Sequence, residues 1–241
     1  MFFIRQSYRL NRKNMKIGVI VAMYAEFRLI HDLLEEKRET CIGDRVFVQG
    51  RSGTKTVVLA KSGIGKVCSA LGTMEMIRNF VPDAVINTGV AGGIDRCLGV
   101  MDIVVGERTV YHDVWCGGEN AYGQIQGMPV YYEADPHLYR TALSVPAPVN
   151  LTGGLICTGD RFITDRTELE AIKNKFPEGL AVDMESCSMA QVCYLEKVPF
   201  LSFRVISDTP GVEKHELQYH HFWTAAPQES FEVFREFLKA L

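Results

Sequence analysis

The sequence has 241 residues, 47% of them hydrophobic, which suits one large α/β domain with a sizeable core. Lysine and arginine together number 26 and aspartate and glutamate 29, so the net charge is −3, and no run of like charges occurs. This balance excludes the basic surface expected of proteins that bind nucleic acid or an anionic membrane. We therefore expect a partner of neither kind.

Seven cysteines are scattered along the chain, mostly within apolar segments, and none forms a CxxC pair. Their spacing predicts reduced, buried thiols in a cytoplasmic protein. Residues 1–14 contain no apolar run long enough for a signal sequence or a membrane span. We expect them to be a frayed N-terminal extension without function, and residues 15–241 to form a single domain.

The first predicted element is a buried strand at residues 16–22, a continuous apolar run rich in β-branched side chains. A helix is predicted over residues 25–37, where apolar side chains recur at helical spacing up to Leu33 and Leu34. Glu26 then lies in the first turn of a helix that follows a strand. Residues 46–48 and 56–60 predict an antiparallel pair closed by a glycine-bearing turn.

Two glycine-rich segments follow the next strands. SGIGK at residues 62–66 precedes a helix predicted to extend to about residue 80, and it lacks the GxxxxGK[ST] spacing of a triphosphate-binding loop, so it predicts a tight turn that lines a site. The strand at 84–89 ends in Val90, Ala91, Gly92 and Gly93. Adjacent glycines let the backbone approach a ligand closely, although a simple turn is the commoner explanation.

The middle of the chain alternates strands with irregular segments. Strands are predicted at 102–105, 109–112 and 155–158, and helices near 135–144 and 166–175. The polar, glycine-rich segment 113–127 lies between them, and its length indicates a functional or interface loop.

Acidic residues follow two later strands. Glu185 comes after the apolar run 180–182, where a helix extending to about residue 196 begins, so it lies beyond the carboxyl end of a strand, the usual ligand position in open α/β sheets. The alternative is a first-turn acidic residue favoured by the helix dipole. Asp208 follows the last strand, 200–206, and a cap or turn role is the simpler interpretation of its position alone. A final helix carries apolar residues at 231, 234, 238 and 241.

The alternation of strands and helices predicts an α/β fold: a three-layer α/β/α sandwich around a mixed, mainly parallel sheet with one antiparallel excursion. Glu26, Glu185 and Asp208 each follow a strand. Together with an apolar shelf formed by Phe162 and Ile163, they predict a site that binds a small polar ligand and transfers a proton.

Six motifs in order carry a resemblance to a known family: KIGVIVAM followed by Glu26, SGIGK at 62–66, NTGVAGG at 87–93, TGDRFI at 158–163, VDMES at 182–186 and RVISD at 204–208. From Met15 to the C-terminus the chain resembles the 5'-methylthioadenosine/S-adenosylhomocysteine nucleosidases of the nucleoside phosphorylase superfamily. The resemblance implies a nucleoside phosphorylase-like fold, a cytoplasmic homodimer, a nucleoside substrate and neither cofactor nor metal. It also implies hydrolysis of the N-glycosidic bond of 5'-methylthioadenosine, S-adenosylhomocysteine or 5'-deoxyadenosine, which releases adenine.

The resemblance implies two catalytic residues. Asp208 matches the acid that protonates adenine N7, and Glu26 matches the carboxylate that positions and activates the attacking water. An ordinary aspartate, with a pKa of about 3.9, is protonated only about one part in a thousand at pH 7. The donor role therefore requires a raised pKa or a proton that passes through a hydrogen-bonded neighbour such as Ser207.

The remaining matched positions bind substrate. Glu185 matches the ligand of the ribose hydroxyls, and the backbone of Ile163 would contact the edge of the adenine. The other implied contacts are Met184 packing on the sugar, Phe162 stacking on the adenine, Arg204 near the water, Met23, Ile64 and Tyr219 as apolar lining, and Ala91, Gly92 and Ser207 beside the ligand.

The chain departs from the family pattern at two places. Val90 stands where a serine is usual, which removes a hydroxyl from the site. Segment 113–127 keeps YHD and YGQ but differs between them, and Gln126 replaces the usual proline. In the family this loop reaches into the 5' pocket of the neighbouring subunit. Because the loop differs here, the resemblance does not define which 5' substituent the protein accepts.

Three other functions compete with this prediction. A phosphate-dependent nucleoside phosphorylase would carry an arginine in the loop after the first strand, where this chain has residues 22–25 and then Glu26. A metal hydrolase could use His215, Glu216, His220 and His221, but His215 and His220 are five apart, whereas HExxH places its histidines four apart. A non-catalytic nucleoside sensor remains open, with Val90 as a sign of lost chemistry.

Overall fold

The structure is a computed structural model that describes residues 14–209, 215–223 and 228–241. Its strands join in one ten-stranded sheet. The strands are β1 (Lys16–Val21), β2 (Glu35–Ile42), β3 (Arg45–Ser52), β4 (Lys55–Lys61), β5 (Ala84–Gly93), β6 (Ile103–Tyr111), β7 (Tyr132–Glu133), β8 (Leu151–Thr158), β9 (Gly179–Asp183) and β10 (Phe200–Asp208). The helices are α1 (Tyr24–Asp32), α2 (Lys66–Phe80), α3 (Pro136–Ser144), α4 (Arg166–Lys175), α5 (Ser186–Glu196), α6 (His215–Phe222) and α7 (Gln228–Ala240).

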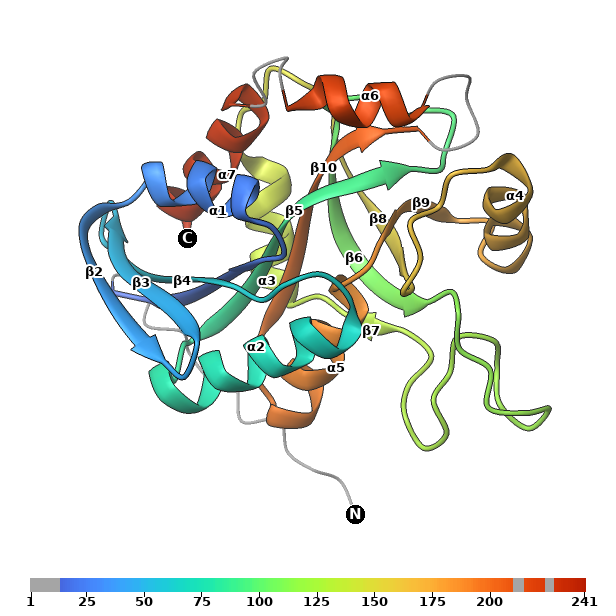
Figure 1. Cartoon of the computed structure of the whole chain (residues 1–241), viewed down its shortest axis with the longest axis horizontal. Coiled ribbons are helices and arrows are strands. Elements are labelled where there is room, and N and C mark those ends of the chain that lie inside the picture. Colours follow the sequence, from blue (N-terminus) through green and yellow to red (C-terminus); the bar gives the residue numbers. More distant parts are fainter. Residues whose placement is uncertain (1–13, 210–214, 224–227) are drawn as a thin grey trace.

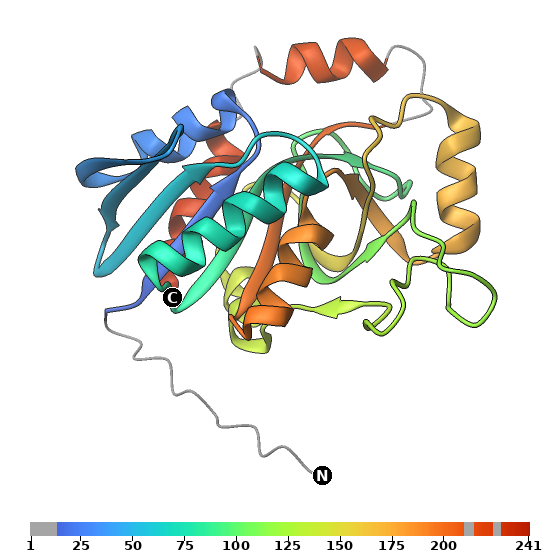
Figure 2. The same ribbon diagram turned by 60° about the horizontal axis from the view of Figure 1, so that its bottom comes forward.

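Helices cover both faces of the sheet (Figure 1, Figure 2). One face packs against α1, α3 and α7, whose buried side chains share a core with apolar residues of β1, β6 and β10. The opposite face packs against α2 and α5, around Met76, Phe80 and Met189. This arrangement confirms the predicted α/β class, with helices on both sides of a mixed sheet.

The sheet contains more antiparallel pairing than the single excursion that the sequence predicts. β1 lies parallel between β4 and β5, and β10 lies parallel to β5. However, β6 pairs antiparallel with β10, β9 pairs antiparallel with β5, and β2, β3 and β4 form an antiparallel meander. Since β8 also joins β6 to β9, the strands β5, β9, β8, β6 and β10 form a closed ring. Pairing between distant strands depends on tertiary contacts that local patterns do not encode.

The prediction of a helix over residues 25–37 is wrong in its second half. α1 ends at Asp32, and Glu35–Ile42 is the exposed edge strand β2, paired with β3. Leu34 is buried beneath this edge although it lies outside the helix. Leu34 is apolar because it packs in the core. Helical spacing alone had suggested that it belongs to a longer helix.

Several other boundaries differ by a few residues. The glycine-bearing segment after residue 89 belongs to β5, which extends to Gly93, and the two strands predicted between 102 and 112 are one strand, β6. The strand and helix predictions at 155–158, 166–175 and 180–182 are confirmed, as is the absence of helix and strand from segment 113–127.

The cysteines are free, as predicted, but four of them are not buried. Cys157, Cys187 and Cys193 lie in the core, whereas Cys41, Cys68, Cys97 and Cys116 are exposed. The exposed four lie on the edge strand β2, on α2 and in loops, where a single apolar residue need not face the core. Within the described residues, no helix is both long and apolar enough to span a membrane. The predicted N-terminal extension lies outside the described residues except for Asn14.

Candidate functional site

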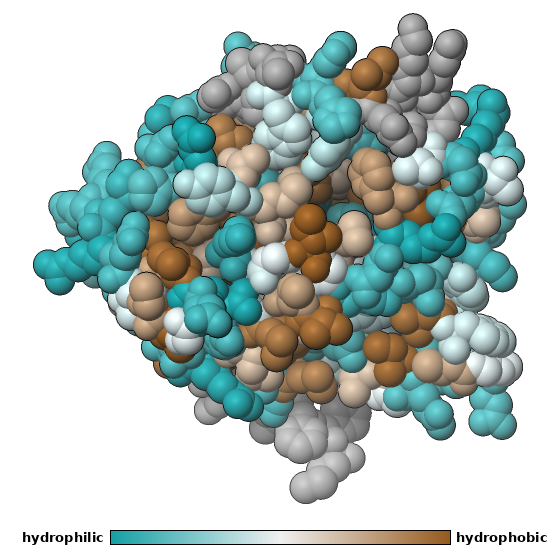
Figure 3. Space-filling view, viewed as in Figure 1, coloured by the Kyte–Doolittle hydropathy of each residue, from teal (hydrophilic) through white to brown (hydrophobic). Residues whose placement is uncertain are grey.

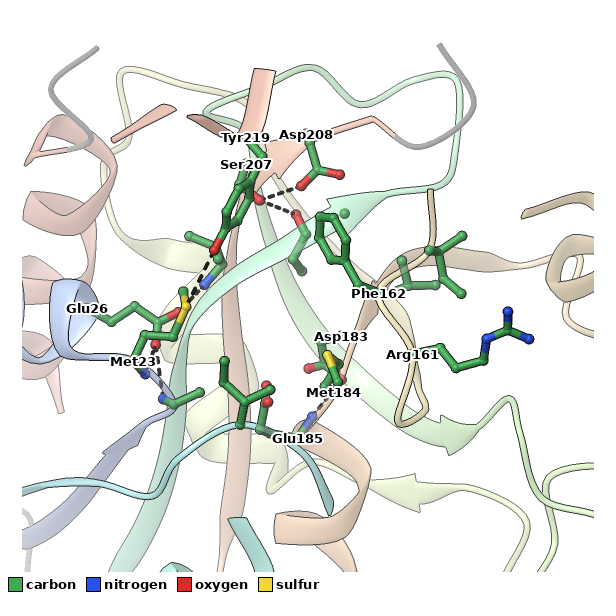
Figure 4. Close-up of a pocket in the computed structure, with 17 residues that line it drawn as sticks. Met23, Glu26, Arg161, Phe162, Asp183, Met184, Glu185, Ser207, Asp208 and Tyr219 are labelled. Carbon is green, nitrogen blue, oxygen red and sulfur yellow. Dashed lines mark hydrogen bonds between the residues drawn. The ribbon is translucent and has the colours of Figure 1, made fainter. Parts of the chain in front are cut away.

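A cavity of about 410 Å³ opens where several strands end, and Tyr219 of α6 contributes to its wall (Figure 4). Its walls come from the ends of β5, β9 and β10, from the segments that follow β1, β4, β8 and β9, and from one residue each of α1 and α6. It therefore gathers residues far apart in the sequence at one edge of the sheet. The sequence-predicted residues that line it are Met23, Glu26, Ile64, Ala91, Gly92, Phe162, Ile163, Met184, Glu185, Ser207, Asp208 and Tyr219.

Glu26 is buried at the base of the cavity and is held by three backbone amides. Its Oε2 accepts hydrogen bonds from the N–H groups of Ala22 at 2.9 Å and Met23 at 2.8 Å, and its Oε1 accepts one from Val90 at 2.9 Å. A Cβ at residue 89 would overlap Oε1, so glycine is required there. Burial raises the pKa of Glu26, while Arg204 and the three amides oppose the shift.

Glu185 faces the cavity from the junction of β9 and α5. It is the N-cap residue of α5, not a first-turn residue, and its side chain does not cap that helix. Instead, Oε1 accepts a hydrogen bond from the amide of Gly65 at 2.9 Å, and Oε2 lies 3.5 Å from Arg204 Nη2. Burial raises the pKa of Glu185 to about 7, Arg204 opposes this shift, and the nearby charge of Asp183 adds to it.

Arg204, which the resemblance places near the attacking water, lies behind the cavity wall and does not line the cavity. It is fully buried on β10. Its Nη2 lies 2.7 Å from Asp183 Oδ2 and 2.5 Å from Asn87 Oδ1. The guanidinium also interacts electrostatically with Glu26 and Glu185. One cation thus stabilises three buried carboxylates, which are otherwise costly to ionise in a protein interior.

Asp208 lies across the cavity from Glu185, at the end of β10 (Figure 4). Ser207 Oγ donates a hydrogen bond to Asp208 Oδ1 at 2.6 Å and lies 3.4 Å from the carbonyl oxygen of Ala91. Both Ser207 and Asp208 are buried. Glu26 and Asp208 therefore face the same cavity from different elements.

The remaining wall is apolar. The Phe162 ring meets the ring of Tyr219 edge to face, with centroids 5.5 Å apart, and Tyr219 Oη donates a hydrogen bond to Met23 Sδ at 3.4 Å. Phe162 is 50% exposed, so its ring is available to a ligand as well as to Tyr219. In Figure 4 the Phe162 ring lies between Asp208 and Met184. A flat apolar group could thus stack there within reach of a carboxyl group.

The sequence did not single out several cavity residues: Ala22, Arg161, Val182 and Asp183, as well as Val90, which it treated only as a departure. Asp183 is the most important of them, since it binds Arg204 and accepts a hydrogen bond from Thr158 Oγ1 at 2.5 Å. Asp183 lies at the end of an apolar strand, two residues before Glu185, and this position could have identified it as a site residue. Arg161 precedes the predicted Phe162, and its side chain pairs with Glu168 and points away from the cavity (Figure 4).

No group of three metal-binding side chains is close enough to hold an ion among the residues whose placement is described. The side chains of His215 and Glu216, which the metal alternative requires, lie outside that description. His220 and His221 lie on α6, both exposed.

Comparisons with known proteins identify the family. Residues 16–239 match the model of the Phosphorylase superfamily. The chain is 38% identical over 231 residues to the 5'-methylthioadenosine/S-adenosylhomocysteine nucleosidase of Geobacillus sp. (strain WCH70), which covers 94% of this chain and 99% of that protein.

Solved structures agree with this result. The 5'-methylthioadenosine/S-adenosylhomocysteine nucleosidase of S. pneumoniae, bound to the transition-state inhibitor MT-ImmA, has a TM-score of 0.89 and 35% identity, covering 94% of this chain and 99% of that one. Futalosine hydrolase of Helicobacter pylori has a TM-score of 0.87 and 31% identity, covering 94% and 98%. The chain belongs to the 5'-methylthioadenosine/S-adenosylhomocysteine nucleosidase family of the Phosphorylase superfamily.

Proposed function

We propose that this protein hydrolyses the N-glycosidic bond of 5'-substituted adenosines, releasing adenine and a 5-substituted ribose. The observation that carries the proposal is a single cavity in which two buried carboxyl groups, Asp208 and Glu26, accompany an exposed aromatic ring, Phe162. The names of the similar proteins supply the substrate class, 5'-methylthioadenosine and S-adenosylhomocysteine.

The chemistry requires two acids with opposite duties. Cleavage of an N-glycosidic bond builds positive charge on the sugar and negative charge on the base. Asp208 donates a proton to adenine N7, so that the base leaves neutral, and Ser207 holds the carboxyl group through the 2.6 Å hydrogen bond. Glu26 accepts a proton from the water that attacks the opposite face of the sugar.

The position of Glu26 favours water over phosphate as the nucleophile. Its carboxylate accepts hydrogen bonds from the amides of Ala22 and Met23, just before α1. A bound anion such as phosphate would otherwise use these donors. A carboxylate in this place also repels phosphate. The only buried cation near it, within the described part of the chain, is Arg204, which Asp183 already pairs.

The other cavity residues bind the nucleoside. Glu185 accepts hydrogen bonds from the ribose hydroxyls, and Arg204 orients it from behind the wall. Phe162 stacks on the adenine and the backbone of Ile163 contacts its edge. The remaining contacts are Met184 against the sugar, Ala91 and Gly92 beside the ligand, and Met23, Ile64 and Tyr219 around the 5' substituent.

The proposal includes a homodimer in the cytoplasm. Large apolar side chains are exposed on α2 and α5: Val67 is 70% exposed, Leu71 56%, Tyr194 56% and Leu195 52%. Apolar surface is visible over these two helices in Figure 3. A second copy of the chain would cover this surface, which a monomer exposes at a cost in solubility. The free cysteines favour a reducing compartment.

A panel of adenosines with different 5' substituents, assayed with and without phosphate, tests the proposal. We expect free adenine from 5'-methylthioadenosine and S-adenosylhomocysteine at rates that do not depend on phosphate. Release that requires phosphate would identify a phosphorylase. Tight binding without any release would identify a nucleoside sensor, in which Val90 marks the lost chemistry.

A further inference from the structure

The start of α2 is held by a carboxylate from a distant turn. Gly65, the N-cap residue of α2, has no side chain to cap the helix. Instead, Asp160 Oδ1 accepts a hydrogen bond from the amide of Lys66, the first residue of the helix, at 2.8 Å. A carboxylate at this place is favoured by the unpaired amides and by the helix dipole. Asp160 therefore acts as the missing cap, although it lies 94 residues further along the chain.

The same helix start also contacts the cavity. The amide of Gly65, one residue before the capped amide of Lys66, donates the 2.9 Å hydrogen bond to Glu185 Oε1. Two consecutive backbone amides thus bind two carboxylates, one that faces the cavity and one that does not. Displacement of one amide also affects the other, because the two N–H groups belong to adjacent peptide units separated only by the Gly65 Cα.

Packing around Gly65 shows how closely Asp160 approaches. Gly65 has a positive φ of 92°, and a Cβ there would lie 2.9 Å from Asp160 Oδ1. Only glycine combines this backbone conformation with such a close carboxylate. Asp160 therefore packs directly against the residue whose amide reaches Glu185.

Asp113 and Lys66 hold Asp160 in place, and Lys66 Nζ lies 4.0 Å from Asp160 Oδ2. The Asp160 amide donates to Asp113 Oδ2 at 2.9 Å, and Asp113 accepts from Lys66 Nζ at 2.8 and 2.9 Å. The Lys66 and Asp113 side chains are 25% and 22% exposed, so their pairing is partly shielded from solvent. Lys66, Asp113 and Asp160 thereby join α2, the loop after β6 and the turn after β8.

We propose that Asp160 is a positioning residue for the ribose half of the substrate: by capping α2 it holds the Gly65 amide against Glu185. The inference rests on the proposed function, in which Glu185 binds the ribose hydroxyls. A carboxylate that accepts a fixed amide keeps its orientation and its ionised form. Without the cap, Glu185 loses one of its partners and becomes harder to ionise.

The test compares Asp160→Ala with Asp160→Asn. For 5'-methylthioadenosine we expect Asp160→Ala to raise KM about tenfold, the effect of losing a hydrogen bond to a charged group, with a smaller change in kcat. The inhibition constant of adenine, which has no ribose, should stay within about twofold of wild type. Asp160→Asn retains an oxygen that can accept from the Lys66 amide, so it should restore most of the affinity.

The pH profile adds a readout that a purely structural role would not move. The Gly65 hydrogen bond lowers the pKa of Glu185, so Asp160→Ala should shift the acidic limb of kcat/KM to higher pH. The other charged groups that act on Glu185 are Arg204 of β10, Asp183 of β9 and Glu26 of α1, and none of them is changed.

Asp135→Ala is the matched control. Asp135 caps α3 by accepting from the amides of His137 at 2.9 Å and Leu138 at 3.0 Å, and α3 does not line the cavity. This variant loses a helix cap without loss of a cavity contact, so its KM should equal that of wild type. If Asp160→Ala does not fold, Asp160→Ser, whose shorter side chain cannot span to the Lys66 amide, takes its place.

Three results would overturn the inference: an unchanged KM in Asp160→Ala, an equal loss of adenine affinity, or no recovery in Asp160→Asn. If the wild-type protein releases no adenine, the proposed function fails independently. Direct calorimetric titration with 5'-methylthioadenosine and with adenine then replaces KM and the inhibition constant, and the same three comparisons decide the role of Asp160.

Discussion

Glu26 illustrates how the backbone prepares a single side chain for chemistry. Three amides hold its carboxylate, and burial raises its pKa, which makes it a stronger base than an exposed glutamate. We expect Glu26→Gln to reduce adenine release by at least about 10², because glutamine cannot accept a proton from water. Nucleoside affinity should change little, since the proposed ribose contacts are made by Glu185 and not by Glu26.

Single-turnover adenine release and calorimetric titration on the same Glu26→Gln sample measure the two quantities separately. Circular dichroism serves as the control that the variant is folded. A folded variant that no longer binds the nucleoside would contradict the assignment and make Glu26 an anchor for the ligand.

Glu185 predicts a pH dependence of stability. Its pKa is about 7 in the folded protein, against an ordinary value of 4.5, so the folded state binds a proton more tightly than the unfolded state. This residue therefore lowers the free energy of unfolding as pH rises from about 4.5 to about 7. Glu185→Gln removes the effect. The free energy of unfolding of the variant, relative to that of wild type, should therefore rise by up to about 3 kcal/mol from pH 5 to pH 8.

Urea denaturation of both proteins at pH 5 and pH 8 measures this gain. Glu26, whose pKa burial also raises, is present in both proteins, and its electrostatic interaction with Glu185 forms part of the measured difference. A stability difference between variant and wild type that stays the same at both pH values would contradict the assigned shift.

Residues of the site differ in how far the sequence can predict them. Glu26, Glu185 and Asp208 lie at or shortly after the ends of apolar strands, and the carboxyl ends of strands are where α/β proteins bind ligands. Arg204 could be named from its motif, but its place behind the wall depends on the buried partners Asp183 and Asn87. Those partners come from separate strands, and only the folded sheet brings them together.

At the scale of elements, α7 packs against β10, the strand that ends in Ser207 and Asp208. Phe234 of α7 is fully buried, with its ring centroid 5.3 Å from that of Phe203 on β10. We expect Phe234→Ala to lower the free energy of unfolding by about 3–5 kcal/mol, the usual cost of a cavity of this size. Since Phe234 does not line the cavity, kcat at a temperature where the variant is folded should be unchanged.

Chemical denaturation and adenine release measure these two effects on Phe234→Ala. A large loss of kcat in a fully folded variant would show that the α7 contact positions Asp208 as well as stabilising the fold.

Elements with strong periodicity were predicted well and edge elements were not. The amphipathic pattern predicts α7, and the apolar runs predict β1 and β10, because each pattern reflects burial against the core. β2 is exposed along nearly its whole length, so its residues carry no such pattern and its charged sequence resembled the end of a helix. Its existence depends on pairing with β3.

At the scale of the whole molecule, the ring formed by β5, β9, β8, β6 and β10 gathers the strand ends at the cavity. Composition and alternation predict the layered α/β class, as found. The closure of the ring could not be predicted, because it depends on the antiparallel pairing of β9 with β5, a strand far earlier in the sequence.

The exposed apolar surface on α2 and α5 predicts a dimer. Sedimentation velocity should give about twice the 27.0 kDa mass of the chain. Leu71→Asp should shift the protein towards the monomer, because it places a charge in the surface that the proposed dimer would cover. Val46→Asp, which alters an exposed apolar residue of β3, is the matched control and should leave the dimer intact. A monomeric wild-type protein at micromolar concentration would contradict the proposed assembly.

The central claim is that Asp208 protonates the departing adenine, and turnover of 5'-methylthioadenosine by Asp208→Asn at pH 7 tests it most directly. Asparagine keeps the size of the side chain and can still bind Ser207, but it cannot donate a proton as an acid does. We predict that kcat falls by about 10² to 10⁴ while nucleoside affinity and the melting temperature remain close to wild type. A near-normal kcat in the folded variant would contradict the account.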